Sequence, residues 1–292
     1  MRGNPAMHDL VAPASLDAVL DLLASEPGKW TPIAGGTELM VAFAAGRLTA
    51  TRLVSLWGIP DLRAIETTPQ SVIIGAAATF LDLRRHGVIS AELPLLARAA
   101  SWIGSIANQT RATLGGNLVN GSPAADSSPA LLAYDAEIEM ISVRGRRRLP
   151  YCEFHTGYKS NVLAPDELLY AIHLQRRFAR HKQYLRKVGT RRAMAIAKVA
   201  LGATALVEQN VIHEIRLAAA SLAPFPIRLG QTESALLGQN ISRATVLAAR
   251  QALLSEVQPI DDIRSTADYR RRVATNLLDE FLLELRREGL RA

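Results

Sequence analysis

The sequence predicts an α+β protein built from two compact units. Its 292 residues are 49% hydrophobic and 21% charged, which is a globular composition, long enough for two domains and too apolar for a disordered chain. Helix-like and strand-like hydrophobic patterns alternate in the first part, whereas the last third groups strands before helices. We therefore expect one unit over residues 1–178, with subdomains at about 1–56 and 57–178, and a second over residues 179–292, where a small antiparallel sheet packs on helices.

The first subdomain is predicted to be a helix, a strand, a glycine turn and a second helix. Ser15 can cap a helix whose apolar residues follow at helical spacing as far as the Pro-Gly pair at 27–28. Gly35 and Gly36 then separate a strand-like segment from an apolar helix expected from Thr37 to about Ala45. This is a strand-turn-helix unit centred on adjacent glycines.

The second subdomain alternates strands and helices until a long loop. Thr79 can cap a helix after a strand, and Pro94 is expected to begin a long helix that reaches about Ala107. The small, polar stretch 110–128 reads as a loop, and a loop of this length inside a domain is usually functional. The other elements expected here are strands at 53–56, 71–75 and 137–143, a helix at 129–134, an arginine-rich turn at 144–148 and an irregular stretch to Pro165.

The C-terminal unit is predicted to contain three strands and then mainly helix. The strands are expected at 184–188, 200–207 and 212–220, and the two main helices at 241–257 and 268–287. The last helix carries an apolar stripe that we expect to be core, formed by Leu277, Leu278, Phe281, Leu282 and Leu285.

Cysteine and histidine content limits the chemistry of the chain. The single cysteine, Cys152, cannot form an internal disulfide or supply the ligands of an iron–sulfur cluster or a structural zinc. The six histidines lack metal-ligand spacing, so we expect no protein-held metal. Redox chemistry in this chain would therefore need an organic cofactor. We also expect no transmembrane helix and a cytoplasmic protein, unless a partner subunit carries an export signal.

Basic residues exceed acidic ones by 34 to 27, and the excess is clustered at 144–148, 176–192 and 270–272. These clusters could be solvated faces, a docking surface for an acidic partner subunit, or a nucleic-acid-binding surface. Stacking aromatic residues do not interleave with the arginines. We therefore expect no nucleic-acid partner.

Two Gly-Gly loops are the strongest candidates for ligand binding. Adjacent glycines let backbone N–H groups turn toward an anion such as a pyrophosphate. The first loop lies within Pro32–Leu39 and the second within Thr113–Asn117, and neither fits a dinucleotide or P-loop fingerprint. Asp126 follows the second loop and can accept hydrogen bonds from ligand hydroxyls such as those of a ribose.

Three segments, 33–39, 113–117 and 122–130, together resemble the FAD-binding subunit of molybdenum hydroxylases, a family that includes the medium subunits of xanthine dehydrogenase and carbon monoxide dehydrogenase. The segments 184–199, 222–228 and 265–271 extend the resemblance over essentially the whole chain. It implies a vanillyl-alcohol-oxidase-like FAD-binding fold, in which two subdomains enclose the flavin, followed by a C-terminal α+β domain.

The resemblance also implies the roles of individual residues. The backbone of the first loop would hold the pyrophosphate, the second loop would face it, and Asp126 would bind ribose or ribityl hydroxyls. Leu169 would be an apolar wall and Lys187 a cation near the ring or its phosphates, while Glu38 and Thr79 would be polar neighbours. The cofactor-binding residues implied are Pro32, Ile33, Ala34, Gly35, Gly36, Thr37, Glu38, Leu39, Thr79, Thr113, Leu114, Gly115, Gly116, Asn117, Asp126, Leu169 and Lys187.

The chain departs from the family at Gln109-Thr110, where many members carry Arg-Asn, and at Ile103, which is aromatic in some relatives. These differences affect the contacts around the second loop. The resemblance assigns no catalytic side chain and no metal ligand to this chain.

The function implied is that of an FAD-carrying electron-transfer subunit. Its expected partners are an iron–sulfur small subunit and a molybdenum-cofactor large subunit, in a dimer of heterotrimers, with NAD, oxygen, a quinone or another protein as electron acceptor. A stand-alone flavin oxidoreductase is one alternative, although it would need its own substrate pocket and usually a longer chain. The others are a non-enzymatic basic-surface binding module and a family member that has lost FAD. A flavin spectrum separates the flavoproteins from the last two.

Overall fold

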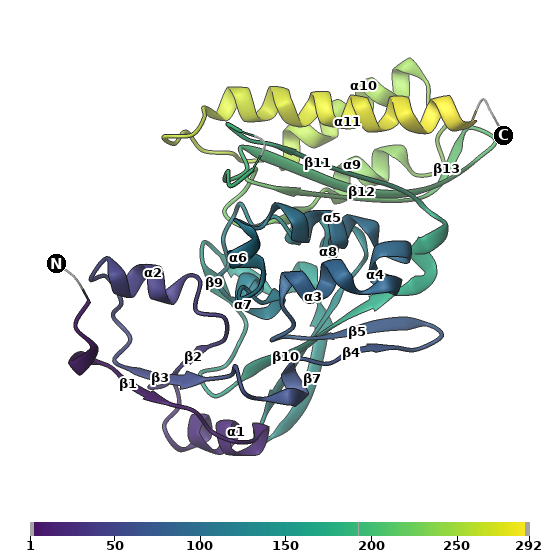
Figure 1. Ribbon diagram of the computed structural model, residues 1–292. Coiled ribbons are helices and arrows are strands. Elements are labelled where there is room, and N and C mark those ends of the chain that lie inside the picture. The colour runs from purple at the N-terminus through teal and green to yellow at the C-terminus, as the bar shows by residue number, and fades with distance from the viewer. Residues whose placement is uncertain (1–2, 192, 290–292) are drawn as a thin grey trace.

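Three sheets form the framework of the chain, from the N-terminal sheet at one end to the C-terminal sheet at the other (Figure 1). The computed structural model describes residues 3–191 and 193–289. Arg192, at the end of the second basic cluster, lies outside the described residues. In the described part of the chain, no helix has the length and apolarity needed to cross a membrane.

The N-terminal sheet is parallel and carries the first glycine loop. It contains β1 (Asp9–Val11), β2 (Thr31–Ile33) and β3 (Arg52–Ser55) in the order β1-β3-β2. Helix α1 (Leu16–Ser25) begins at Ser15, whose hydroxyl accepts the Ala18 N–H as the sequence predicts, and packs its leucines on this sheet. The loop after β2 leads into α2 (Leu39–Ala44).

The central domain is a five-stranded antiparallel sheet covered by helices. The strands run in the order β4-β5-β10-β6-β7, and the helices bury the largest hydrophobic cluster of the chain against one face. The strands are β4 (Ile65–Thr67), β5 (Ser71–Gly75), β6 (Glu137–Ser142), β7 (Gly145–Pro150) and β10 (Leu168–Gln175), with a separate hairpin of β8 (His155–Gly157) and β9 (Ser160–Asn161). The helices are α3 (Phe80–Arg85), α4 (Gly87–Glu92), α5 (Pro94–Trp102), α6 (Ile106–Gln109), α7 (Leu114–Val119) and α8 (Ser128–Ala133).

One predicted helix boundary and one predicted loop in this domain are wrong. The helix expected from Pro94 to Ala107 ends at Trp102, because Gly104 adopts a left-handed conformation (φ +47°) and Ser105 caps a new helix, α6. The stretch 110–128 is not all loop, since α7 lies within it. Its two glycines disfavour a helix, but the Thr113 cap and the burial of apolar α7 side chains in the core outweigh that preference.

The expected arginine-rich turn is instead an edge strand. Strand β7 pairs with β6, and its side chains are mostly exposed. Arg146 and Arg148 both reach the buried carboxylate of Glu139 on the neighbouring strand, with N···O distances of 3.2 and 3.0 Å. Cross-strand ion pairs of this kind explain how a run of like charges can form a strand.

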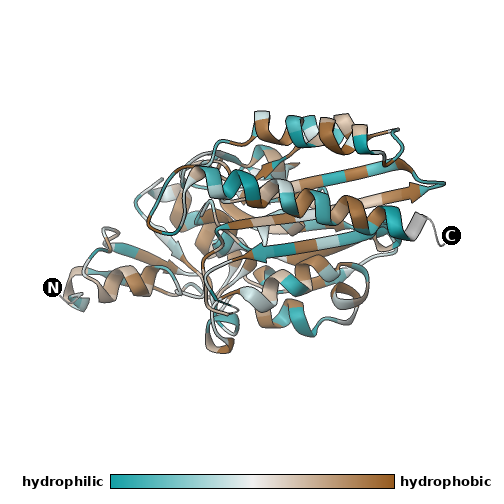
Figure 2. Cartoon of the chain, turned by 90° about the horizontal axis from the view of Figure 1, so that it is seen from above, coloured by the Kyte–Doolittle hydropathy of each residue, from teal (hydrophilic) through white to brown (hydrophobic). Residues whose placement is uncertain are grey.

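The C-terminal domain is a four-stranded antiparallel sheet between two helical layers (Figure 1). One face carries the long helix α11, whose predicted apolar stripe is confirmed as core because all five side chains are at most 5% exposed. Seen from above, α11 runs along the strands (Figure 2). The other face packs on α8, where Gly202 leaves room for the Pro129 carbonyl. The strands are β11 (Lys182–Val188), β12 (Val199–Glu208), β13 (Val211–Ala220) and β14 (Ile227–Arg228), and the helices are α9 (Gly230–Leu236), α10 (Arg243–Glu256) and α11 (Ala267–Gly289).

Most described arginines of the three basic clusters are paired with carboxylates inside this chain. The Asp135 carboxylate forms ion pairs with three arginines, Arg177, Arg216 and Arg228. These pairs link the central domain to the C-terminal sheet. Further pairs are Arg144–Asp166, Arg147–Glu167, Arg176–Glu92, Arg270–Asp262 and Arg271–Asp268. In the described part of the chain, most of the charge in these clusters is therefore neutralised by carboxylates of the same chain.

Candidate functional site

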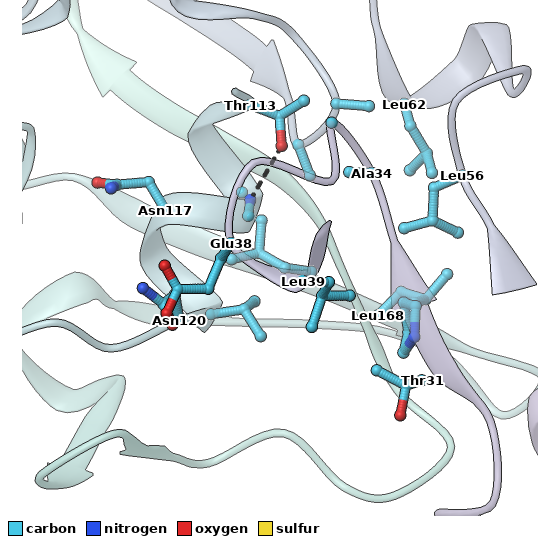
Figure 3. Close-up of a pocket in the computed structure, with 18 of the residues that line it drawn as sticks. Thr31, Ala34, Glu38, Leu39, Leu56, Leu62, Thr113, Asn117, Asn120 and Leu168 are labelled. Atoms are coloured by element: carbon cyan, nitrogen blue, oxygen red, sulfur yellow. Dashed lines mark hydrogen bonds between the residues drawn. The ribbon is translucent and has the colours of Figure 1, made fainter. Parts of the chain in front are cut away.

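A cavity of about 500 Å³ lies between the N-terminal subdomain and the central domain, and both glycine loops line it. This volume is typical of sites for small ligands and cofactors. In Figure 3, Thr113, Asn117 and Asn120 lie on one side of the cavity, and Leu56, Leu62 and Leu168 lie on the other. The predicted residues that line the cavity are Pro32, Ala34, Gly35, Gly36, Thr37, Glu38, Leu39, Thr113, Gly115, Gly116, Asn117 and Leu169.

The first loop supplies backbone donors. Gly36 adopts a left-handed conformation (φ +73°), which turns the chain from β2 into α2. A Cβ atom at Gly35 would lie 1.7 Å from the Arg111 carbonyl oxygen, so the two loops touch backbone to backbone. Within the described residues, the N–H groups of Gly35, Gly36 and Thr37 donate to no protein acceptor. A run of unpaired N–H groups of this kind can bind an anion.

The second loop contributes shape and side chains, because the N–H groups of its two glycines are already paired within the protein. The N–H groups of Leu114 and Gly115 donate to carbonyls of the central domain, and that of Gly116 donates to the Thr113 hydroxyl at 3.2 Å (Figure 3). The Asn117 side-chain oxygen accepts the Ser127 hydroxyl at 2.6 Å, which fixes the orientation of its amide. The two loops therefore differ in chemistry although their sequences look alike.

An apolar wall forms the rest of the cavity. Leu169 comes from β10 next to a register shift in its pairing with β6, and it is 4% exposed. Ile103 comes from the turn between α5 and α6 and also lines the cavity. Such a wall suits the face of a flat aromatic ring and excludes water from it.

Gln109 anchors the turn that carries Ile103. Its buried side chain accepts a hydrogen bond from Arg84 and donates two, to the carbonyl oxygens of Ser101 (3.2 Å) and Ile103 (3.0 Å). The departure from the family at this position therefore lies behind the cavity wall.

A buried ion pair lies behind the second loop. Lys187 on β11 contacts Asp126 at 2.6 Å, and both side chains are about 90% buried. Burial raises the pKa of the Asp126 carboxyl to about 6, although the Lys187 ammonium lowers it. The other carboxylate oxygen, Oδ1, is buried and accepts no hydrogen bond from the described protein. A buried acceptor without a donor calls for a partner, such as a ligand hydroxyl.

Five predicted residues lie outside the cavity lining: Ile33, Thr79, Leu114, Asp126 and Lys187. Ile33 lies on β2, and Leu114 is fully buried in the central core. The Thr79 hydroxyl caps α3 and donates to Asp82 at 2.7 Å. These three residues support the loops from behind.

Several further lining residues were not among the predicted site residues. They include Leu56, Leu62, Ala76, Ala77, Val119, Asn120, Asn161, Leu163, Ala164, Pro165 and Leu168. Val119 and Asn120 lie within the stretch 110–128, whose length pointed to a functional segment, whereas the others had no signal in the sequence.

Comparison with known proteins identifies the family. A model described as the FAD binding domain in molybdopterin dehydrogenase matches residues 6–175, and one described as the CO dehydrogenase flavoprotein C-terminal domain matches residues 184–285. The chain belongs to the family of FAD-binding subunits of molybdopterin dehydrogenases. Members of this family are FAD-dependent oxidoreductase subunits, and the resemblance read from the sequence is confirmed.

The relatives of this FAD-binding subunit match it along most of their length. The xanthine dehydrogenase FAD-binding subunit of Escherichia coli O157:H7 is 32% identical over 88% of each chain. The carbon monoxide dehydrogenase medium chain of Hydrogenophaga pseudoflava is 27% identical over 95% of this chain and 96% of that protein. A solved structure of carbon monoxide dehydrogenase from the same organism superposes with a TM-score of 0.90, covering 96% of each chain. The predicted fold class is thereby confirmed.

The cavity lining, together with Asp126 outside it, fits FAD. The unpaired N–H groups of the first loop suit a pyrophosphate, the apolar wall suits a flavin ring, and the free Oδ1 of Asp126 suits a hydroxyl. The described part of the chain brings together no three His, Cys, Asp or Glu side chains that could hold a metal ion.

Proposed function

We propose that this chain is the electron-transfer subunit of a molybdenum hydroxylase complex, receiving electrons from an iron–sulfur subunit and passing them to an acceptor. The observation that carries the proposal is the cavity between the two glycine loops, with donors on one side and an ion pair behind the other. Bound FAD would supply two-electron redox chemistry. NAD, oxygen, a quinone and another protein remain candidate acceptors.

We infer partner subunits because this chain lacks the residues that would hold an iron–sulfur cluster. Its one cysteine cannot hold an iron–sulfur cluster, which takes four protein ligands. Its relatives include proteins named as a medium chain and as an FAD-binding subunit. We therefore propose a small iron–sulfur subunit and a large molybdenum-cofactor subunit as partners, assembled as a dimer of heterotrimers in the cytoplasm.

The residues of this chain have three tasks in the proposed function. The backbone of Gly35, Gly36 and Thr37 holds the pyrophosphate through its N–H groups. Asn117, oriented by Ser127, contacts the cofactor from the facing loop. The apolar wall then keeps water away from the ring.

The Asp126–Lys187 pair has two roles in the same site. Asp126 Oδ1 accepts a cofactor hydroxyl, while its Oδ2 holds the ammonium of Lys187 in place. A cation fixed near the cofactor stabilises negative charge that develops there. Because one partner lies in the central domain and the other on the C-terminal sheet, binding also depends on the contact between the two domains.

Electron delivery from a partner tests this proposal. The oxidised FAD-loaded chain is mixed anaerobically with a chemically reduced iron–sulfur subunit that co-purifies with it, and the visible flavin absorbance is followed. We expect bleaching at a rate proportional to partner concentration before saturation. If the iron–sulfur subunit neither binds the chain nor bleaches it, the electron-transfer proposal is wrong. If the chain alone turns over organic substrates, the stand-alone oxidoreductase is correct.

A further inference from the structure

Trp57 carries two arginines on its indole ring. It lies in the turn after β3, is half-buried and does not line the cavity, although Leu56 and Leu62, on either side of it in the chain, do so (Figure 3). The guanidinium carbon of Arg111 lies 3.8 Å from the centre of the Trp57 ring, and that of Arg63 lies 4.7 Å from it. At such distances a guanidinium group is attracted to the negative face of an indole. Two like charges are therefore held at one ring, beside the cavity but outside it.

Arg111 joins this stack to both glycine loops. The Arg111 carbonyl oxygen lies 1.7 Å from the position that a Cβ atom of Gly35 would take, so its peptide touches the first loop. The next residue, Ala112, lines the cavity and leads into the second loop at Thr113. Within the described residues, the Arg111 guanidinium forms no ion pair and donates no hydrogen bond to the protein. The Trp57 ring is therefore the contact that fixes this side chain.

Arg63 joins the stack to the second loop by another route. Its guanidinium pairs with Asp82 at an N···O distance of 3.6 Å. The Asp82 Oδ2 accepts hydrogen bonds from the hydroxyl and the backbone N–H of Thr79, at 2.7 and 2.9 Å, and Thr79 forms a β-bridge with Thr113. Both side chains of the Arg63–Asp82 pair are more than one-third exposed, so this ion pair alone is worth little. The stacking of Arg63 on Trp57 strengthens this route to the second loop.

The charge of the two arginines explains why position 57 carries an aromatic ring. Two guanidinium groups repel one another, and an aliphatic side chain between them would offer only packing for their stems. The negative face of an indole attracts each of them and offsets the repulsion. Without the ring, the segments 57–63 and 108–111 are expected to move apart, and the Arg111 peptide would lose its close contact with Gly35.

We propose that Trp57 is a positioning residue of the FAD site, which holds the two glycine loops at the separation that a bound pyrophosphate requires by binding Arg63 and Arg111. Trp57 does not touch the cofactor in this account, because its effect passes through the Arg111 peptide and through the contacts of Arg63 with the second loop. The inference rests on the proposed placement of the pyrophosphate at residues 35–37. It adds a residue that controls this site from outside the cavity.

The test separates the electrostatic role of the ring from its size. Trp57→Leu removes the aromatic face and Trp57→Tyr keeps one. Tryptophan analogues of increasing ring fluorination, introduced at position 57 alone by codon suppression, weaken the negative face while the shape of the side chain is nearly kept. The FAD affinity of each apo-chain is measured by flavin fluorescence, and its stability by thermal unfolding.

The matched control is Tyr269→Leu, which removes a stack of the same kind in the C-terminal domain. There the Lys198 ammonium lies 5.1 Å from the centre of the Tyr269 ring, and neither residue lines the cavity. We expect the Kd for FAD to rise about 5–10-fold for Trp57→Leu, to stay within about twofold of wild type for Trp57→Tyr, and to rise stepwise with fluorination. The control should bind FAD as wild type. The fluorinated chains decide the question if Trp57→Leu does not fold, because their shape is kept.

A double variant shows whether Trp57 acts through Arg111. Because stacked residues act as a unit, Arg111→Gln combined with Trp57→Leu should weaken FAD binding less than the two single effects together, and additive effects would contradict the inference. Fluorinated chains that all bind FAD as wild type overturn it, since the ring would then act by its size alone. So do Trp57 variants that bind FAD as wild type while Gly35→Ala binds it weakly. If Gly35→Ala also binds FAD as wild type, the placement of the pyrophosphate is wrong and the inference falls with it.

Discussion

Replacing Gly35 by alanine tests the contact between the two loops. The added Cβ would lie 1.7 Å from the Arg111 carbonyl oxygen and 2.4 Å from its carbonyl carbon. Both are backbone atoms, so no side-chain rotation can relieve the clash. Because Cβ atoms do not approach other atoms within 3.0 Å, the two loops must separate by more than 1 Å.

The size of the effect follows from two terms. Overpacking of a well-packed site costs about 1–3 kcal/mol. A separation of this size also moves the N–H groups of Gly35 and Gly36 away from an anion, and a hydrogen bond to a charged group is worth about 1.5–3 kcal/mol. We expect the Kd for FAD to rise by about 10–100-fold and the melting temperature of the apo-chain to fall.

The assay is an FAD titration of the apo-chain followed by flavin fluorescence. Gly87→Ala is the matched control, because a Cβ at Gly87, at the start of α4, meets nothing within 4 Å. If Gly35→Ala binds FAD with the affinity of wild type and of the control, the loops do not cradle the pyrophosphate and the account of the site is refuted.

Three further predictions concern Gln109 and Asp126, next to the site, and Leu278 in the C-terminal core. Gln109→Met removes three hydrogen bonds and should lower the free energy of unfolding by about 2–4 kcal/mol in urea denaturation. It should also alter the visible circular dichroism of the flavin. An unchanged circular dichroism spectrum would show that Gln109 does not support the cavity wall. The pKa of Asp126 is near 3.8 in the unfolded chain and about 6 in the folded apo-chain, so the folded chain binds this proton more tightly. Protonated Asp126 therefore contributes to the free energy of unfolding; the contribution is full below pH 3.8 and is lost as the pH rises through about 6. Asp126→Asn should remove that fall in a series of denaturation curves, and parallel wild-type and variant profiles would contradict it. Leu278→Ala, in the core of α11, should cost about 2–5 kcal/mol of stability in the same assay while the flavin spectrum is kept; a loss below about 1 kcal/mol would contradict its place in the core.

Local patterns in the sequence predicted the parts of the fold that depend on local chemistry. The Ser15 cap and the apolar stripe of α11 are properties of a few neighbouring residues, and both are confirmed. Both glycine loops line one cavity, as the resemblance to the FAD-binding subunits, and not the glycine spacing alone, implied.

Long-range pairing decided what the sequence did not reveal. Strand β10 is the middle strand of the central sheet, but it pairs with β5 and β6 far away in the chain, so nothing near it marks it as central. Strand β7 is a different case, because it pairs locally with β6 in a hairpin; it looked like a turn because its run of arginines hid the strand pattern, and their partner Glu139 lies on the strand before it.

The candidate site shows the same limit. Asp126 and Lys187 are 61 positions apart, and spacing alone could not show that they form a buried pair. The free N–H groups of the first loop and the paired ones of the second also look alike in sequence, since both loops read Gly-Gly. The acceptors of the second loop distinguish them: the carbonyls of Ala76 and Ala78, brought in by the fold, and the Thr113 hydroxyl.

The absorbance spectrum of the purified chain tests the central claim most directly, with the released cofactor identified by chromatography and mass. The account predicts a flavin spectrum and FAD at about one molecule per chain. A colourless chain that takes up no added FAD, even with its partner subunits present, would contradict the assignment of this cavity as the FAD site.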